Sequence, residues 1–144
     1  MNLLVVDASV AVKWVLPAYD EPLSEQASKL FGRFVKEEAQ FLAPDLLWAE
    51  FGNVMWKAAR RGRCTPARAQ AALDALLHLN ITSMPSQPMI EDALGLAIDF
   101  NCTVYDSLYV VLAINSGTQL ITADEKLVQS FPAPMPVKWL GAVS

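Results

Sequence analysis

The sequence has 144 residues, of which 53% are hydrophobic and 18% charged, and its formal net charge is −4. This length suits one domain with a sizeable core, and the charge excludes a polycation that grips nucleic acid non-specifically. No apolar run reaches membrane-spanning length and the N-terminus lacks a signal-peptide pattern, so we expect a cytoplasmic protein without membrane contact. The distant Cys64 and Cys102 are expected to be reduced thiols.

The first half of the chain alternates short apolar runs with helical patterns. NLLVVD is typical of a central parallel strand, and SVAVKWVLP predicts a helix that lasts until Pro17. The residues of the next predicted helix that share one apolar face are Leu23, Ala27, Leu30, Phe31, Phe34 and Val35. FLAP predicts a second strand. A helix from about Asp45 to Arg61 follows, with Gly62 as its C-terminal stop.

The alternation continues beyond this glycine. Thr65 and Pro66 are suited to the cap and first turn of a helix that runs to about Leu79. ITSM predicts a third strand, and a further helix is expected from Ser86 to Phe100.

A buried helix is predicted around TVYDSLYVVLA, Thr103 to Ala113, because the chain is apolar on every face from Leu108 to Ile114. The strand TQLIT, a short helix from Asp124 and a last strand near VKWL complete the chain. Strands that alternate with helices predict a parallel sheet with right-handed crossovers. We therefore expect one α/β domain over residues 1–144, a three-layer α/β/α sandwich with a central parallel sheet.

Four acidic residues are predicted to meet at one edge of this sheet. Asp7 ends the first strand, Asp124 follows TQLIT, Asp106 begins the buried helix, and Glu50 lies on the polar border of the helix after FLAP. Ligands of open α/β sheets bind outside the carboxyl ends of the strands. Four carboxylates there would repel one another unless a cation neutralised them, and oxygen ligands without softer ones favour Mg²⁺ or Mn²⁺.

Each acid also has a purely structural explanation. Asp7 could cap the helix that follows it, and Asp124 could favour a helix N-terminus. Asp106 could complete a capping box with Thr103, while Glu50 could be a solvated boundary residue. These explanations suffice for the residues taken singly, but the four acids together favour a cation site.

The motifs VVDASV, LLWAEFGNV, YDSLYVVLAINSGTQLIT and TADEKL resemble those of PIN-domain ribonucleases, above all the VapC-type toxins of bacterial toxin–antitoxin pairs. The resemblance covers essentially the whole chain in order and spacing. It implies that Asp7, Glu50, Asp106 and Asp124 are catalytic, and that Asp7, Asp106 and Asp124 hold one or two divalent metal ions. The expected reaction is metal-dependent hydrolysis of RNA by water, leaving a 5′-phosphate and a 3′-hydroxyl.

The same resemblance implies further features. Ser9 and Thr122 match hydroxyl positions that the family often places beside the water at the metal, although local capping explains them equally well. A small cognate antitoxin is the implied protein partner, and a homodimer is expected, which would help to explain the high hydrophobic content.

One stretch, KAARRGRCTPAR, holds five of the eleven basic residues. Arg60, Arg61 and Arg63 are candidates for contacts to RNA phosphates beside the acidic pocket. The alternative is a solvated helix end, where cations suit the helix dipole.

Two other functions stay open at this point. A receiver-like phosphoacceptor domain could use Thr122 and Lys138, although ITSMPSQ lacks the aspartate that would accept the phosphate. A non-catalytic interaction module could keep an acidic pocket. A Ser-His-Asp triad would need His78, which we expect to be a packed residue at a helix end.

Overall fold

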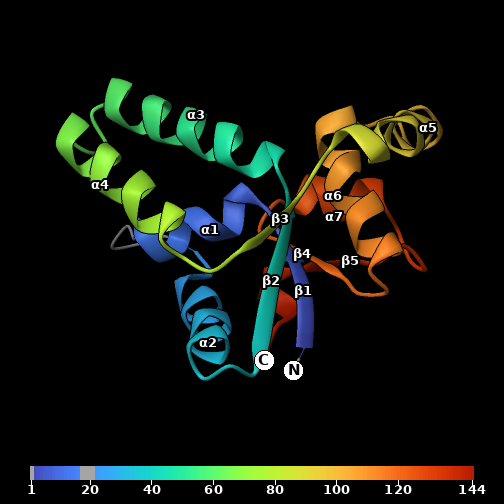
Figure 1. Ribbon diagram of the computed structural model, residues 1–144, viewed down its shortest axis with the longest axis horizontal. Helices are drawn as coiled ribbons and strands as arrows, with labels where there is room; N and C mark the ends of the chain where they lie inside the picture. Colours follow the sequence, from blue (N-terminus) through green and yellow to red (C-terminus); the bar gives the residue numbers. More distant parts are fainter. Residues whose placement is uncertain (1, 17–21) are drawn as a thin grey trace.

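The computed structural model describes residues 2–16 and 22–144 (Figure 1). Within them, five parallel strands form one sheet in the order β3-β2-β1-β4-β5. The strands are β1 (Asn2–Val6), β2 (Ala39–Pro44), β3 (Thr82–Met84), β4 (Leu120–Thr122) and β5 (Val137–Trp139). The first strand is central, which explains why Val5 and Val6 have no exposed surface.

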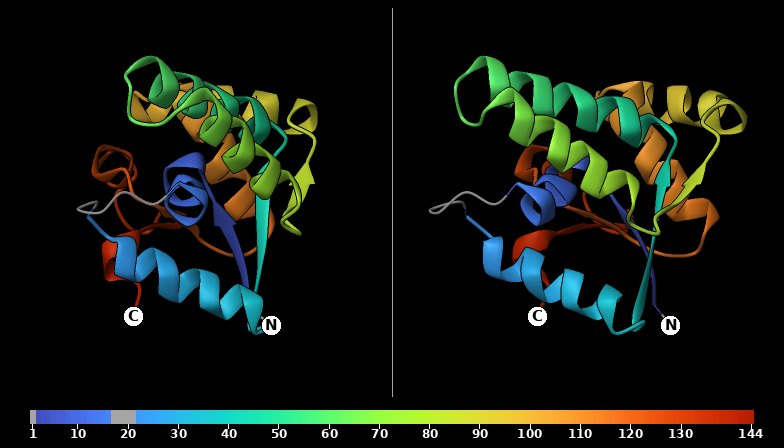
Figure 2. Two further views of the ribbon diagram at one scale, coloured as in Figure 1. Left: turned by 90° about the vertical axis from the view of Figure 1, so that its left-hand side faces the viewer. Right: turned by 60° about the vertical axis from the view of Figure 1, so that its left-hand side comes forward.

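Helices cover both faces of the sheet (Figures 1 and 2). The described α-helices are α1 (Ala8–Val15), α2 (Ser24–Val35), α3 (Leu46–Arg60), α4 (Pro66–Leu77), α5 (Ile90–Phe100), α6 (Val104–Asn115) and α7 (Glu125–Ser130). Two short 3₁₀ helices are η1 (Gln87–Met89) and η2 (Leu140–Ala142). In Figure 1, α1 to α4 lie on one side of β1 and β2, and α5 and α6 lie on the other. The predicted three-layer α/β/α sandwich is confirmed.

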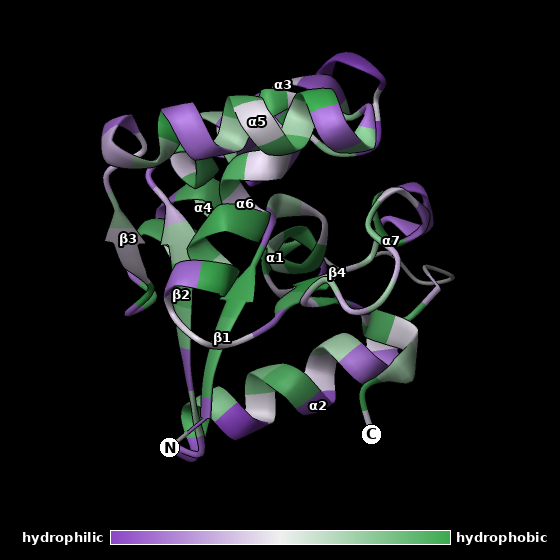
Figure 3. Cartoon of the chain, turned by 90° about the vertical axis from the view of Figure 1, so that its right-hand side faces the viewer, coloured by the Kyte–Doolittle hydropathy of each residue, from purple (hydrophilic) through white to green (hydrophobic). Residues whose placement is uncertain are grey.

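The core is built where β1 meets α6. Every residue from Ser107 to Ala113 is buried, as the all-round apolar pattern of this helix predicts. The apolar character of β1 is visible in Figure 3, where most of the strand is green. On the other face, Trp14 of α1 stacks on Phe41 of β2 with ring centroids 4.8 Å apart. These two layers fix the strand ends at which the acidic residues lie.

The helix ends predicted from glycine and threonine in the sequence agree with the structure. Gly62 has φ +72° directly after α3, and Arg63 N donates to Ala58 O, as expected of a glycine stop. Thr65 caps α4 through its hydroxyl, which accepts a hydrogen bond from Arg68 N at 3.1 Å. The predicted end of the first helix at Pro17 lies outside the described residues.

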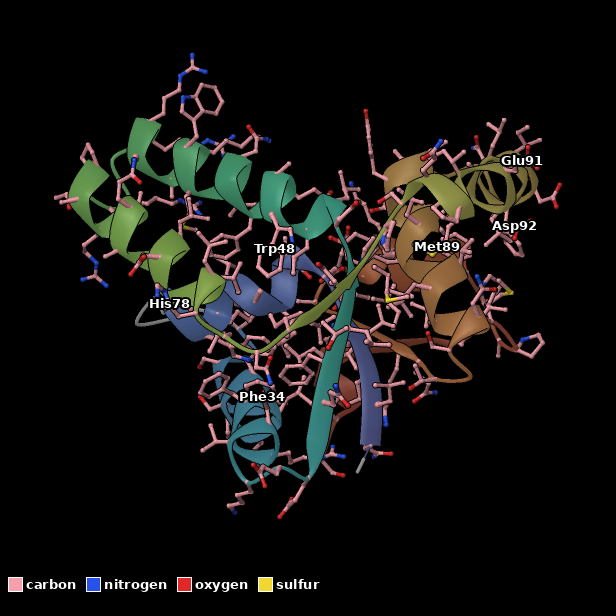
Figure 4. The ribbon with its side chains drawn as sticks, viewed as in Figure 1. Phe34, Trp48, His78, Met89, Glu91 and Asp92 are labelled. Carbon is pink, nitrogen blue, oxygen red and sulfur yellow. The ribbon has the colours of Figure 1, made fainter. Side chains whose placement is uncertain are left out.

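Three details differ from the predictions. The helix expected from Ser86 to Phe100 begins with η1, where Pro88 cannot donate a backbone hydrogen bond, and α5 starts only at Ile90. Val35 is 64% exposed, because it is the last residue of α2 and the chain turns away at Glu37 with φ +60°. His78 follows α4 (Figure 4), but its side chain is 77% exposed rather than packed.

The strand order also decides against the receiver-like alternative. Receiver domains have the flavodoxin-like order 2-1-3-4-5, in which the third strand lies beside the first. Here β1 pairs with β2 and β4, and β3 lies at the edge next to β2. No single helix in the described parts of the chain is long and apolar enough to cross a membrane.

Candidate active site

The carboxyl ends of β1 and β4 bring Asp7 and Thr122 together. Val6 pairs with Ile121 in the parallel register, so the next residues of both strands are neighbours. The Thr122 hydroxyl donates a hydrogen bond of 2.6 Å to Asp7 Oδ2, and both residues are buried. The two strand ends, which were expected at one edge of the sheet, are in direct contact through this hydrogen bond.

Two hydroxyl groups hold the Asp7 carboxylate from both sides. Ser9 Oγ donates to Asp7 Oδ1 at 2.5 Å and accepts from Ala123 N at 3.0 Å. Thr122 Oγ1, which donates to Oδ2, accepts from Asp124 N at 3.1 Å. Each hydroxyl thus links Asp7 to the backbone that follows β4. This arrangement orients Asp7 and fixes the start of the segment that carries Asp124.

Asp7 also caps α1, as its structural explanation required. Oδ1 accepts a hydrogen bond from Val10 N at 3.4 Å. Burial raises the pKa of Asp7 from 3.8 to about 6, against the lowering effect of its three hydrogen bonds, and the charge of Asp106 adds to the increase. Capping and a role in a charged pocket are therefore combined in one residue.

Glu50 lies in the second turn of α3 and is held by Tyr109 of α6. The Tyr109 hydroxyl donates a hydrogen bond of 2.7 Å to Glu50 Oε1. Burial raises the pKa of Glu50, this hydrogen bond lowers it, and the charge of Asp106 raises it. Burial is also the main cause that raises the pKa of Tyr109, so its hydroxyl remains a donor.

Sequence reasoning missed Tyr109. Tyr109 is 1% exposed and packs in the core, so in the sequence it could not be distinguished from any other buried aromatic residue. The available signal was its hydroxyl, three residues after Asp106 on the same predicted helix, because a buried tyrosine hydroxyl usually has a polar partner.

Asp106 occupies the first turn of α6, and Asp124 precedes α7. Thr103 caps α6, with its hydroxyl accepting from Asp106 N at 3.0 Å. Burial raises the pKa of Asp106, the Thr103 hydroxyl lowers it, and the charge of Asp124 raises it. Asp124 Oδ1 caps α7 by accepting from Lys126 N and Leu127 N at 3.0 and 3.4 Å.

The four acids share one electrostatic environment with Asp106 at its centre. The charge of Asp106 raises the pKa of both Asp7 and Glu50, and that of Asp124 raises the pKa of Asp106. In residues 2–16 and 22–144, none of these carboxylates forms an ion pair with a basic side chain. Asp106 thus interacts electrostatically with each of the other three acids, and within the described ranges no basic side chain pairs with any of the four.

A divalent cation fits the chemistry of these donors, because they are carboxylate oxygens that form no ion pair with a basic side chain of the described residues. Asp124 uses only Oδ1 in its described hydrogen bonds, which leaves Oδ2 for a ligand. The geometry is not that of a closed metal site: among the described residues, no group of three or more His, Cys, Asp or Glu side chains is positioned to hold a metal ion.

The basic stretch lies away from this pocket. Arg60 ends α3, ten residues after Glu50, which corresponds to about 15 Å along the helix axis. Arg61 and Arg63 belong to the exposed turn between α3 and α4, which is coloured hydrophilic in Figure 3. These arginines flank the acidic pocket at a distance and do not enter it.

Comparison with known proteins gives the family. The profile of the PIN domain matches residues 4–130. The chain belongs to the PIN-domain family. It is 37% identical to ribonuclease VapC3 of Pyrobaculum aerophilum over 134 residues, which cover 90% of this chain and 95% of that protein. It is 34% identical to ribonuclease VapC1 of Mycobacterium tuberculosis over 96% of this chain and 98% of that protein. These relatives place it in the VapC group of PIN-domain proteins.

Solved structures confirm the PIN-domain fold. A Pyrobaculum aerophilum protein superposes with a TM-score of 0.72 at 22% identity, covering 97% of this chain and 90% of that one. A toxin–antitoxin complex from Klebsiella pneumoniae contains a chain with a TM-score of 0.63 at 15% identity, covering 94% of this chain and 95% of that one. At these identities the likeness concerns the fold alone.

Proposed function

We propose that this PIN-domain protein is a metal-dependent endoribonuclease and the toxin of a toxin–antitoxin pair. The observation that carries the proposal is the group of four carboxylates around Asp106, which no basic side chain of the described residues balances. Membership of the PIN-domain family supports the proposal, because two relatives that align with nine-tenths or more of this chain are named ribonuclease VapC.

Asp7, Asp106 and Asp124 would hold the divalent cation, Mg²⁺ or Mn²⁺. When bound, the cation would position the scissile phosphate, lower the pKa of a water molecule and stabilise the leaving oxygen. Ser9 and Thr122 fix the direction of the Asp7 oxygens through their hydrogen bonds of 2.5 and 2.6 Å.

Glu50 is the candidate for accepting the proton of the attacking water. Tyr109 occupies Oε1, and Oε2 has no hydrogen-bond partner in the described chain, so Oε2 is the atom that would take the proton. A carboxylate with a raised pKa is a stronger base than an ordinary surface carboxylate. In-line attack by water leaves a 5′-phosphate on one fragment and a 3′-hydroxyl on the other.

The partners we propose are an antitoxin, RNA and a second copy of the chain. A toxin–antitoxin complex among the structural neighbours supports the first. The homodimer is supported by exposed aliphatic residues at successive turns of α5, where Ile90, Leu94 and Ile98 are 44, 53 and 71% exposed. Cys64 and Cys102 are both free thiols, which agrees with a cytoplasmic location.

Cleavage of a circular single-stranded RNA tests the activity. An endonuclease converts a circle to a linear product, whereas an exonuclease needs an end, and one relative is named exonuclease VapC9. We expect linear product with Mg²⁺ or Mn²⁺ and none with a chelator. Asp106→Asn is the inactive control and Asp92→Asn, an exposed acid on α5 (Figure 4), the matched active one. An intact circle beside degraded linear RNA would contradict the endonuclease; no degradation of either would favour the non-catalytic module.

Growth arrest tests the toxin assignment. Expression of the wild-type chain should stop growth, and co-expression of the small protein encoded beside it should restore growth. Asp106→Asn should be harmless at an equal protein level. Arrest by both forms would show that toxicity does not depend on the carboxylate pocket.

A further inference from the structure

A groove of about 450 Å³ runs between α3 and α4, away from the acidic pocket. Its walls are largely apolar, with Met55 and Ala59 from α3 and Leu73 from α4, and Gln70 supplies an amide. Trp56 lines it and is 53% exposed. Trp48 on the same helix, by contrast, points toward α1 (Figure 4) and packs against the core. A large aromatic ring left in solvent beside a groove is a candidate contact for a ligand.

The residues that line this groove, and the turn that joins its two helices, include basic side chains but no acidic ones. From Phe51 to Leu73 the sequence contains no Asp or Glu, although the chain as a whole has a net charge of −4. The same stretch holds five of the eleven basic residues, namely Lys57, Arg60, Arg61, Arg63 and Arg68. The α3–α4 hairpin therefore carries a basic segment, residues 57–68, on an otherwise acidic protein. We call this segment the basic arm, and its positive charge complements a polyanion.

Trp56 and Arg60 form a paired surface at the start of this arm. The Arg60 guanidinium carbon lies 5.2 Å from the centroid of the Trp56 ring. Aromatic rings and guanidinium planes are the groups on which unpaired bases stack, and stacking is available only where bases are not already stacked in a duplex. The pair therefore favours single-stranded nucleic acid over a double helix.

A polar strip connects this pair with the acidic pocket. Glu50, Asn53, Lys57 and Arg60 follow one another at i, i+3, i+7 and i+10 on α3, so they share one face of the helix. Asn53, Lys57 and Arg60 are exposed, and Glu50 is half-buried at the end of the strip. Trp56 is six residues from Glu50, about 9 Å along the axis. One nucleic acid strand can thus follow α3 from the groove to the pocket.

We propose that the α3–α4 groove binds a single-stranded segment of the RNA, with an unpaired base stacked on Trp56 and the adjoining phosphates on the basic residues of the arm. The identity of the polyanion rests on the proposed ribonuclease function. The binding itself needs neither the metal nor cleavage. A protein segment is the other occupant to consider, but a groove lining that contains Arg60 and no acid, next to a turn with further arginines, favours a phosphate backbone.

Binding of a short single-stranded oligoadenylate to the metal-free protein in a chelator tests the proposal without cleavage. Trp56→Ala should weaken binding by roughly 5- to 150-fold, the range for loss of one stacked base, and Trp56→Phe should lie between it and wild type. Leu77→Ala is the matched control, because Leu77 is a 54% exposed apolar residue of the same hairpin that does not line the groove. It should bind like wild type.

Two further measurements distinguish base stacking on Trp56 from non-specific binding. The oligonucleotide should quench tryptophan emission of the wild type and not of Trp56→Phe. Arg60→Ala should reduce the dependence of binding on salt, by about 0.7 in the slope of log K against log salt for each lost phosphate contact. Lys36→Ala, an exposed cation that follows α2, should leave the slope unchanged.

The outcomes distinguish this inference from the function it rests on. Equal affinities of wild type and Trp56→Ala would overturn the groove assignment even if the protein cleaves RNA. Trp56-dependent binding by a protein that cleaves nothing would support the groove and overturn the nuclease. Equally tight binding of duplex RNA, or quenching by an antitoxin peptide and not by the oligonucleotide, would overturn the single-stranded RNA site.

Discussion

The Tyr109 hydroxyl donates a 2.7 Å hydrogen bond to Glu50 Oε1, and so joins α6 to α3 beside the acidic pocket. The two residues are 59 positions apart in the sequence, yet this bond fixes one Glu50 oxygen and leaves the other free for chemistry. Because the tyrosine ring is buried in the core, the position of Glu50 is tied to the packing of the sheet.

Tyr109→Phe removes only this hydroxyl. We expect the free energy of unfolding at neutral pH to fall by about 1–2 kcal/mol, and RNA cleavage to fall more strongly than RNA binding. The pKa of Glu50 should rise, since the bond that lowers it is lost. The lower limb of the pH–rate profile should then move to higher pH. Tyr105→Phe, at a 61% exposed tyrosine of the same helix, is the matched control. Identical pH profiles for both variants and wild type would show that Tyr109 does not position Glu50.

Replacement of single acids should separate catalysis from folding. Asp7→Asn, Asp106→Asn and Asp124→Asn should each abolish cleavage, because each removes a negative charge from the proposed metal site. Circular dichroism should be unchanged, and the metal-free variants should be as stable as wild type or slightly more stable, since repulsion is relieved. Glu50→Gln should have a milder effect than these three. Unchanged cleavage by any two of the aspartate variants would refute the site assignment.

Thr122 is expected to stabilise the charged form of Asp7. Thr122→Val keeps the shape but removes both the donor to Asp7 Oδ2 and the acceptor of Asp124 N. Loss of these buried bonds should lower the free energy of unfolding at neutral pH by about 1–3 kcal/mol, measured by urea denaturation. Thr122→Ser retains the hydroxyl and should lose less. A larger loss for serine than for valine would assign the residue to packing.

The fold was largely predictable because its signals are local. Apolar runs such as NLLVVD, the glycine stop at Gly62 and the Thr65 cap each depend on a few neighbouring residues, and the structure contains all of them. The rule for parallel strand ends placed Asp7 and the residues after the strand TQLIT at one edge of the sheet, and the hydrogen bond from Thr122 to Asp7 shows that these two strand ends meet.

What the sequence could not provide is long-range geometry. Tyr109 looked like any apolar core residue, since periodicity does not show where a single hydroxyl points. Trp56 carried no signal either, because only the packing of α3 on α4 leaves its ring in a groove. The acidic residues were expected to converge, but the distances between their carboxylates depend on how α3, α6 and α7 pack around the strand ends, and a sequence motif does not specify that packing.

The metal-free protein should lose stability as the pH rises from about 4 to about 6. The pKa of Asp7 is 3.8 in its ordinary state and about 6 in the folded protein, so in this window the folded state holds a proton that the unfolded chain has released. The stabilisation is complete below pH 3.8 and is lost as the pH passes about 6, and it amounts to at most about 3 kcal/mol. Urea denaturation in a chelator should show this slope, reduced in Asp7→Asn. Stability that increases with pH across this window in wild type but not in Asp7→Asn would contradict the raised pKa.

The central claim is that these carboxylates form a site for a divalent cation, and the melting temperature measured with and without Mg²⁺ tests it most directly. An ion that binds only the folded state stabilises it by about 2.7 kcal/mol at a hundredfold its dissociation constant. We expect Mg²⁺ and Mn²⁺ to raise the melting temperature of wild type, Na⁺ at equal ionic strength to raise it less, and the Asp7→Asn/Asp106→Asn double variant to lose most of the response. Equal shifts of wild type and double variant would contradict the cation site.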